Sequence, residues 1–164
     1  ATYPAGPRRR VSDRRPVVTA LRMARDLDAG AVGAILSEFV DTSDWLPRIH
    51  TRAEDIAHAA RMIDLGRVHV AEDSGTVVGF CARNGDDLDA LYVASEKRGQ
   101  GIGAALLRHA QTVVDRLELW TFQANEGAQR FYLRHGFVEL QRTDGSGNDE
   151  RLPDIQYEWQ RETV

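Results

Sequence analysis

The sequence predicts a mixed α+β domain whose central sheet is mostly antiparallel. Three strand-like runs follow one another between residues 67 and 93, separated only by short turns, which is the pattern of an antiparallel meander. Helix-like periodicity precedes this meander and alternates with further strands after it. The 164 residues fit a single domain with one core.

The N-terminal part is predicted to form a strand and two helices. Residues 17–23 alternate as a first strand. Apolar residues then recur at helical spacing, namely Leu27, Ala31, Ala34, Ile35 and Phe39. After a loop rich in turn residues at 41–47, Thr51 and Glu54 form a capping box that starts a second helix, which we expect to end near residues 65–66.

The predicted meander contains the only cysteine of the chain. Its strands are expected at residues 67–72, 76–82 and 88–93, with turns at 73–75 and 84–86. Cys81 lies in the apolar second strand and has no partner for an internal disulfide. We expect an inert core thiol, because no neighbour in the sequence would activate it for catalysis.

A glycine-rich turn at residues 98–103 leads from the third strand of the meander into a helix. One face of this helix is predicted from the spacing of Ile102, Ala105, Leu106, His109, Val113 and Leu117. His109 is expected to pack on or beside that face, because no second histidine or carboxylate stands at metal-ligand spacing.

The C-terminal part alternates strands with one helix. Strands are predicted at residues 117–121, 137–140 and 154–159. Between the first two of them, Asn125 caps a helix that Gly136 ends in a left-handed conformation. The loop at 143–149 is flexible by composition.

Charge is unevenly distributed along the chain. The net charge is −4, yet residues 1–16 carry five arginines against Asp13 alone. Such an arm fits either a nucleic-acid or membrane-surface tail or a disordered leader, and the lack of interleaved aromatic residues favours the leader. We therefore predict a disordered basic arm at 1–16, a single domain at 17–164 and no nucleic-acid partner. No apolar run approaches the roughly 20 residues of a membrane span, so a cytoplasmic location without a membrane partner is expected.

The glycine-rich turn at 98–103 predicts a phosphate-bearing ligand. Alternating glycines leave backbone N–H groups uncovered, and the following helix offers unpaired N–H donors and a partial positive charge. Two common phosphate motifs do not fit this turn. No Lys-Ser/Thr pair follows it for a nucleoside triphosphate, and Leu106 replaces the third glycine of a dinucleotide fingerprint.

Two blocks of the sequence carry a resemblance to a known family. The turn Arg98-Gly99-Gln100-Gly101-Ile102-Gly103 fits the pattern (Q/R)-x-x-G-x-(G/A), and residues 125–137 fit N-x-x-A-x-x-F-Y-x-x-x-G-F. Together they resemble the GCN5-related N-acetyltransferases (GNAT), whose order of elements also runs from residue 17 to residue 159. The resemblance implies the GNAT fold, a mostly antiparallel twisted sheet of about six or seven strands, flanked by about four helices and splayed in the middle.

The resemblance implies acetyl-CoA as the acetyl donor, with no metal. The pyrophosphate would lie on the backbone of Arg98, Gly99, Gln100, Gly101, Ile102, Gly103 and Ala104. The pantetheine would pair like an added strand beside Leu91, Tyr92 and Val93, in the opening between the strands at 88–93 and 117–121. The function implied is N-acetyl transfer from acetyl-CoA directly to a primary amine.

The second block supplies further implied site residues. Asn125 stands where the family contacts the pantetheine arm, with Ala128 matched in the same block. Tyr132 stands where a tyrosine often protonates the departing thiolate, and its alternative reading is simple packing beside Phe131. A backbone N–H near Val93 is expected to meet the oxyanion.

The reaction also needs a neutral acceptor amine. Because an alkylamine has a pKa of about 10.4, neutralising it at pH 7 costs about 4.6 kcal/mol, and a carboxylate or a water chain is expected near the acceptor. Asp89 is the first candidate for this base, with Glu72 and Glu96 behind it. The alternatives are a solvated strand residue for Asp89 and a turn carboxylate paired with Lys97 or Arg98 for Glu96.

Acceptor recognition is expected in the parts that the family pattern fixes least, which are the loop with Trp45 and His50, the second helix, and the loop at 143–149. Trp45, exposed by its sequence context, would wall a pocket, stack on a cation or pack between the first two helices. Trp45 and Glu96 are the candidate substrate contacts. The acceptor is predicted to be a small-molecule amine, a peptide N-terminus or a lysine. A non-catalytic acyl-CoA-binding module with the same fold is the alternative, and a homodimer is left open.

Overall fold

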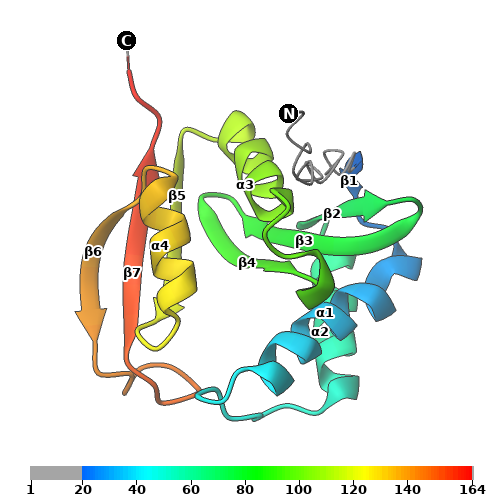
Figure 1. Cartoon of the computed structure of the whole chain (residues 1–164), viewed down its shortest axis with the longest axis horizontal. Coiled ribbons are helices and arrows are strands. Elements are labelled where there is room, and N and C mark those ends of the chain that lie inside the picture. Colours follow the sequence, from blue (N-terminus) through cyan, green and yellow to red (C-terminus); the bar gives the residue numbers. More distant parts are fainter. Residues whose placement is uncertain (1–19, 164) are drawn as a thin grey trace, which may run out of the picture.

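The computed structural model describes residues 20–163 (Figure 1). The predicted basic arm at 1–16 lies outside the described residues, as does the start of the strand predicted at 17–23. The remainder of that strand is β1, Ala20–Met23.

Within residues 20–163 the strands form one seven-stranded sheet. The other strands are β2 (Val68–Asp73), β3 (Thr76–Asn84), β4 (Asp87–Val93), β5 (Arg116–Phe122), β6 (Val138–Thr143) and β7 (Asp154–Gln160). Their order is β1-β2-β3-β4-β5-β7-β6, and every neighbouring pair is antiparallel except the parallel pair of β4 and β5. The predicted meander and mostly antiparallel sheet are confirmed.

Four α-helices of the described chain cover the two faces of this sheet: α1 (Ala29–Thr42), α2 (Arg52–Asp64), α3 (Ile102–Val113) and α4 (Glu126–Arg134), with short 3-10 turns η1 (Asp26–Asp28) and η2 (Ser95–Lys97). α1 and α2 pack on β2, β3 and β4 around Val32, Ile63 and Phe80. α3 and α4 pack on the opposite face around Leu106 and Tyr157 (Figure 1). Over residues 20–163, no helix combines the length and apolarity that a membrane span requires.

Helices α2 and α4 begin at the residues that the sequence predicts. The Thr51 hydroxyl accepts a hydrogen bond from the Glu54 N–H, and the Glu54 carboxylate accepts one from the Thr51 N–H, each at 3.1 Å. The Asn125 side-chain oxygen accepts a hydrogen bond from the Ala128 N–H. These caps satisfy N–H groups that the first turn of a helix leaves unpaired.

The predicted face of α3 is partly wrong. Val113 is 55% exposed, and Leu117 belongs to β5 and not to the helix. The helix ends at Val113 because Val114 is already in an extended conformation. The residues that α3 buries are Ile102, Leu106, Leu107 and Ala110.

The predicted face of the first helix needs a similar correction. Leu27 lies in η1 and is 98% exposed, and Ala31 and Ala34 face solvent. Ile35 is buried as predicted, and Val32, which was not among the predicted residues, shares the buried stripe with it. The two β-branched side chains fill the interior on the sheet, whereas the small alanines gain little from burial.

The sheet is open between β4 and β5. These two strands share one bridging pair, Asp87 with Glu118, supported by a hydrogen bond from the Glu118 N–H to the Asp86 carbonyl at 2.8 Å. Beyond this pair the strands separate, and we call the space between them the gap (Figure 1). The predicted splay of the sheet is confirmed.

The register of β4 determines which backbone groups face the gap. The Ala94 N–H donates to the Val78 carbonyl at 2.8 Å, so the backbone at even positions of this part of the chain points towards β3. Alternation along an antiparallel strand then directs the N–H and C=O groups of Leu91 and Val93 towards the gap. The gap therefore presents a strand edge that lacks a partner strand.

Helices α1 and α2 approach closely at Gly33, which yields a first prediction. A Cβ at Gly33 would stand 2.7 Å from the Ile56 Cα, so Gly33→Ala is expected to lower the free energy of unfolding by about 1–3 kcal/mol. At Gly30 in the same helix a Cβ would meet nothing within 4 Å, and Gly30→Ala should be neutral or gain up to about 1 kcal/mol. Urea unfolding followed by circular dichroism measures both variants. Equal midpoints would contradict the close approach.

Candidate active site

The glycine-rich turn forms an open anion cradle at the start of α3. Gly99 and Gly101 have φ of 74° and 83°, in the left-handed region that favours glycine, and Gly101 is the N-cap without a side-chain acceptor. Nothing lies within 4 Å of a Cβ built on either glycine. The N–H groups of the first turn of α3 therefore remain available for an anion.

The cradle lies beside the unpartnered edge of β4. The Arg98 Nε donates to the Val93 carbonyl at 3.3 Å, which ties the turn to the strand end. A Cβ at Gly103 would be 3.7 Å from both Val93 and the ring of Phe131, so the start of α3 packs between β4 and α4. The structure thus brings the predicted cradle residues and the predicted strand edge together.

Helix α4 adds Tyr132 to the same face of the sheet. The Tyr132 ring packs against Phe131, Phe137 and Tyr157, and the residue is 8% exposed. Burial raises the pKa of the Tyr132 hydroxyl far above its usual value, with smaller contributions from Tyr92 and Cys81. Tyr132 is therefore a packing residue whose hydroxyl stays protonated, and its part in proton transfer stays a prediction.

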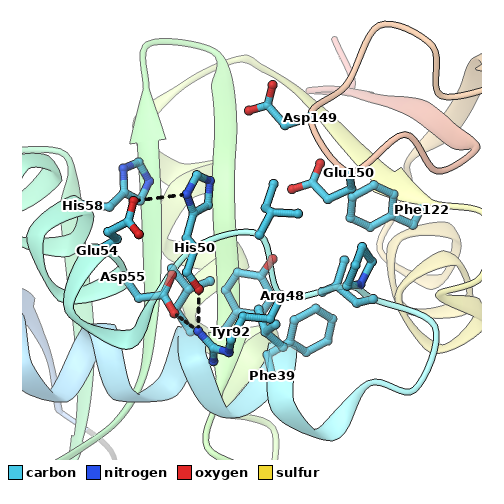
Figure 2. A pocket seen from close by; sticks show the side chains of 15 residues that line it. Phe39, Arg48, His50, Glu54, Asp55, His58, Tyr92, Phe122, Asp149 and Glu150 are labelled. Carbon is cyan, nitrogen blue, oxygen red and sulfur yellow. Dashed lines mark hydrogen bonds and ion pairs between the residues drawn. The ribbon is translucent and has the colours of Figure 1, made fainter.

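A cavity of about 480 Å³ opens on the other face of the sheet, and we call it the acceptor cavity (Figure 2). Its walls come from α1, from the α1–α2 loop, from α2, from the ends of β4 and β5, and from the β6–β7 loop. They include Phe39, Arg48, His50, Glu54, Asp55, His58, Tyr92, Phe122, Asp149 and Glu150. Figure 2 shows Glu54 and His58 on one side, with Asp149 and Glu150 across the cavity from them.

Tyr92 lies at the base of the acceptor cavity. Its ring centroid is 4.7 Å from that of Phe39 and 5.8 Å from that of Phe80. Burial raises the pKa of Tyr92 to about 12, and the nearby Glu150 carboxylate adds to the effect. The resemblance implies a cofactor contact for Tyr92 along its strand, whereas its side chain lines this cavity on the other face of the sheet.

Arg48 holds the α1–α2 loop in place. Its guanidinium is 3.0 Å from the Asp55 carboxylate and 2.8 Å from that of Asp41, and it donates to the carbonyls of Ser37 and His50. Asp55 is 6% exposed, so this contact compensates a buried negative charge. One arginine therefore fixes the wall that carries His50.

Trp45 is half-buried, and its predicted exposure is wrong. Its ring centroid lies 6.1 Å from that of Phe39 and 5.6 Å from that of Phe122, both in edge-on geometry. Such aromatic contacts between α1 and β5 explain why the indole leaves solvent. Trp45 supports two walls of the acceptor cavity from behind and is absent from its lining.

The three candidate bases lie apart from one another. Asp89 lines a separate cavity of about 310 Å³ at the closed end of the gap, where β4 carries a bulge. Burial raises the pKa of the Asp89 carboxyl, Asp87 adds to this, and Arg67 and His58 oppose it. Glu72 is engaged by Arg22 at 2.6 Å on the far side of the sheet, next to β1.

Glu96 lies exposed in η2 beside the cradle, and Asp89 alone of the three candidates borders the gap. None of the three candidates lines the acceptor cavity. Ion pairs with Lys97 or Arg98, the alternative reading of Glu96, are not formed, because Lys97 pairs with Asp73. The base assignment stays a prediction.

The segments that line the acceptor cavity were predicted from the sequence, but most of the lining residues within them were not. The prediction included His50, the second helix and the loop at 143–149. It did not single out Arg48, Asp55 or Glu150. One signal was available, because the capping box fixes the phase of α2 and places Glu54 and His58 four residues apart on one face. No local pattern indicated the other three.

Two further predictions concern Cys81, a possible nucleophile, and His109, a possible metal ligand. Cys81 is free and buried, and burial raises its pKa to about 12, so the core-thiol prediction is confirmed. His109 packs its ring 4.5 Å from that of His69 on the α3 side. Among residues 20–163 no three His, Cys, Asp or Glu side chains are arranged to hold a metal ion.

An anion cradle beside an open strand edge, with a cavity on the other face of the sheet, can hold a phosphate-bearing ligand and a second molecule on opposite sides of the sheet. Residues 64–139 match the family model described as an acetyltransferase (GNAT) domain. The peptidyl-lysine N-acetyltransferase YjaB of Salmonella typhimurium is 36% identical over 126 residues, covering 76% of this chain and 86% of that protein. The chain belongs to the GCN5-related N-acetyltransferase family.

Solved structures agree with this fold. Apo-form YjaB from Escherichia coli has a TM-score of 0.74 at 25% identity, over 88% of this chain and 99% of that chain. YncA from Salmonella typhimurium, solved with acetyl-CoA, shares the fold with a TM-score of 0.66 at 21% identity, over 89% of this chain and 95% of that chain.

The predicted family, fold and enzyme class are therefore confirmed: the chain is an acetyl-CoA-dependent N-acetyltransferase that moves an acetyl group to an amine. This result agrees with the leading prediction of an enzyme and not with the alternative of a non-catalytic acyl-CoA-binding module. The roles of individual residues, the domain bounds, the cytoplasmic location and the oligomeric state stay predictions.

The contacts of Arg48 generate a prediction for the loop. Arg48→Ala removes the ionic partner of the buried Asp55, so the free energy of unfolding should fall by about 1–3 kcal/mol. Arg52 also pairs with Asp41, but its side chain is 76% exposed, and Arg52→Ala should change stability by less than about 0.5 kcal/mol. Thermal or urea unfolding compares the two variants. A similar small effect in both would show that Arg48 does not hold the loop.

Proposed function

We propose that this enzyme acetylates the ε-amine of lysine in peptides, with acetyl-CoA in the gap and the lysine entering from the acceptor cavity. The observation that carries the proposal is the gap itself, which has the cradle and Tyr132 on one face and a partly acidic cavity on the other. The names of the relatives, peptidyl-lysine N-acetyltransferases, support the choice of acceptor.

The residues present fit acetyl-CoA. Positive φ at Gly99 and Gly101 exposes N–H groups that suit a pyrophosphate, together with those of Arg98, Gln100, Ile102, Gly103 and Ala104. The free edge at Leu91 and Val93 suits the amides of a pantetheine arm. Asn125 uses its side-chain oxygen as a cap and keeps its NH₂ group for donation, and the small Ala128 packs nearby in α4.

Acetyl-CoA, when bound, supplies a thioester carbonyl, and the chain supplies charge stabilisation and protons. The Val93 N–H faces the gap and is our candidate donor to the developing oxyanion. Tyr132 remains the candidate acid for the departing thiolate because it holds a protonated hydroxyl, although burial raises the pKa of that hydroxyl and makes its proton harder to donate. Tyr132 then regains a proton from solvent.

The acceptor cavity suits a long cationic side chain. Phe39, Tyr92 and Phe122 offer apolar walls for a methylene stem, and Glu150 offers an anion for the ammonium. Asp89 does not line this cavity, so its predicted role as proton acceptor would require a chain of water molecules between the amine and the closed end of the gap. Trp45 acts as a positioning residue behind Phe39 and Phe122.

Thiol release with defined peptides tests this function. A peptide with a blocked N-terminus and one lysine should release free CoA, and mass spectrometry should find the acetyl group on the lysine. The same peptide with norleucine in place of lysine should be inert. Turnover restricted to free N-termini, polyamines or aminoglycosides would contradict the proposed acceptor.

Substitution of Gly101 tests the cradle. Gly101→Ala puts a Cβ at φ 83°, where the N–H groups converge, and should weaken acetyl-CoA binding about tenfold or more. Gly85→Ala is the matched control, because Gly85 has φ 60° in the β3–β4 turn with equally open space around its Cβ. Calorimetry measures the dissociation constant of acetyl-CoA for both variants. Urea unfolding measures the loss of stability that both variants share because alanine replaces a glycine at positive φ. Equal binding by both variants would remove the cradle from the donor site.

Substitution of Tyr132 tests the proton donor. Tyr132→Phe keeps the ring packing and removes the hydroxyl, so kcat should fall about 100-fold while acetyl-CoA binding is kept. Tyr157→Phe is the control, since the Tyr157 hydroxyl lies near Glu139 and Arg142 of β6. Steady-state rates and calorimetry compare the two. An unchanged kcat in Tyr132→Phe would leave Tyr132 with packing alone.

A further inference from the structure

We propose that a groove along β5 binds the peptide on one side of the acetylated lysine and selects a second basic residue through the carboxylates at the closed end of the gap. The inference rests on the proposed lysine acceptor and deepens it, because it states which peptides the site prefers. The groove joins the acceptor cavity at Phe122 to the Asp87–Asp89 cavity at Trp120, and the following observations support it.

Three cavities on this face share walls. The acceptor cavity shares Phe122 and Glu150 with a cavity of about 680 Å³ under the β6–β7 loop. That cavity in turn shares Trp120 with the cavity of Asp87 and Asp89. Lining residues shared by neighbouring cavities therefore link the acceptor cavity to the closed end of the gap.

The side chains of Glu118, Trp120 and Phe122 follow the groove because alternate residues of a strand share a face. The intervening Leu117 and Leu119 point to the other face, where α3 and α4 cover them. On the groove side α1 and α2 cover only β2 to β4. Trp120 is consequently 49% exposed, a large aromatic surface beside the gap.

The closed end of the groove is acidic. Five carboxylates gather there, Asp86, Asp87, Asp89, Glu118 and Glu158, and the arginines nearby are Arg67, Arg83 and Arg116. Arg116 is shared among Asp86, Glu118 and Glu158. In the described chain neither Asp87 nor Asp89 forms an ion pair, so both attract a cation from a ligand.

The chemistry of the groove fits a basic, extended peptide. Trp120 offers a face for a guanidinium or ammonium next to the two free carboxylates. Glu118 and Phe122 are four positions apart, a span of about 13 Å along the strand. A peptide in extended conformation covers that span in about four residues. Because the long side chains of lysine and arginine extend along the groove as well, the second basic residue is expected about two to five residues from the lysine.

A peptide panel tests the groove. Each peptide carries one lysine and a blocked N-terminus, with one arginine placed two to five residues before or after the lysine, or with glutamine in its place. We expect kcat/KM to be about two- to fivefold higher for arginine at the matching spacing, on one side only, and the preference should fall as salt rises. In Asp87→Asn the ratio of arginine to glutamine peptides should approach one.

Two controls separate the groove from the reaction. Because Asp87 also affects the pKa of Asp89, any effect of Asp87→Asn on the reaction itself should appear equally with a short blocked lysine derivative that cannot reach the groove, so the ratio of arginine to glutamine peptides is the readout. Asp26→Asn removes an exposed carboxylate from η1, away from the groove, and should keep the arginine preference.

The outcomes distinguish this proposal from the proposed function. Acetylation of every peptide without a charge preference, or a preference that survives in Asp87→Asn, would overturn the groove and leave the lysine acceptor intact. No acetylation of any peptide would overturn the proposed function first. A polyamine acetylated with higher kcat/KM than every peptide would assign the carboxylates to a small dication and overturn the peptide groove.

Discussion

β4 and β5 are joined by one bridging pair, Asp87 with Glu118, and the arrangement of the site depends on that limit to their pairing. With more pairs the strands would close the sheet and satisfy the backbone of Leu91 and Val93. With none, the two halves of the sheet would lose their common backbone contact. A single pair keeps one continuous sheet and leaves an open strand edge, which a ligand with amide groups can use.

The open sheet is held by packing at both ends. On the closed side, α3 and α4 bury Leu106, Leu117 and Tyr157 in one cluster that spans both halves. At the open side the two halves meet through the rings of Phe39, Trp45 and Phe122. Burial of large side chains across the gap replaces the hydrogen bonds that the strands do not make.

How much the sequence could predict depended on how local the information was. The cradle and the α4 cap are readable, because Gly101 and Asn125 act within a few residues of themselves. The acceptor cavity is not, because its walls come from six separate segments. Trp45 was expected in solvent for the same reason: only the fold brings Phe122 to it. The error at Leu117 has another cause, since apolar spacing continued past the point where the backbone left the helix.

The Asp87–Glu118 pair also has a geometric consequence as a pivot. The two strands that border the gap are tied at one end, so a small rotation about this pair is magnified at the other end. Over a lever of about 13 Å, a rotation of about 5° changes the width of the mouth by about 1 Å. Substitutions around the pivot can therefore adjust which acceptors fit without altering any residue that touches them.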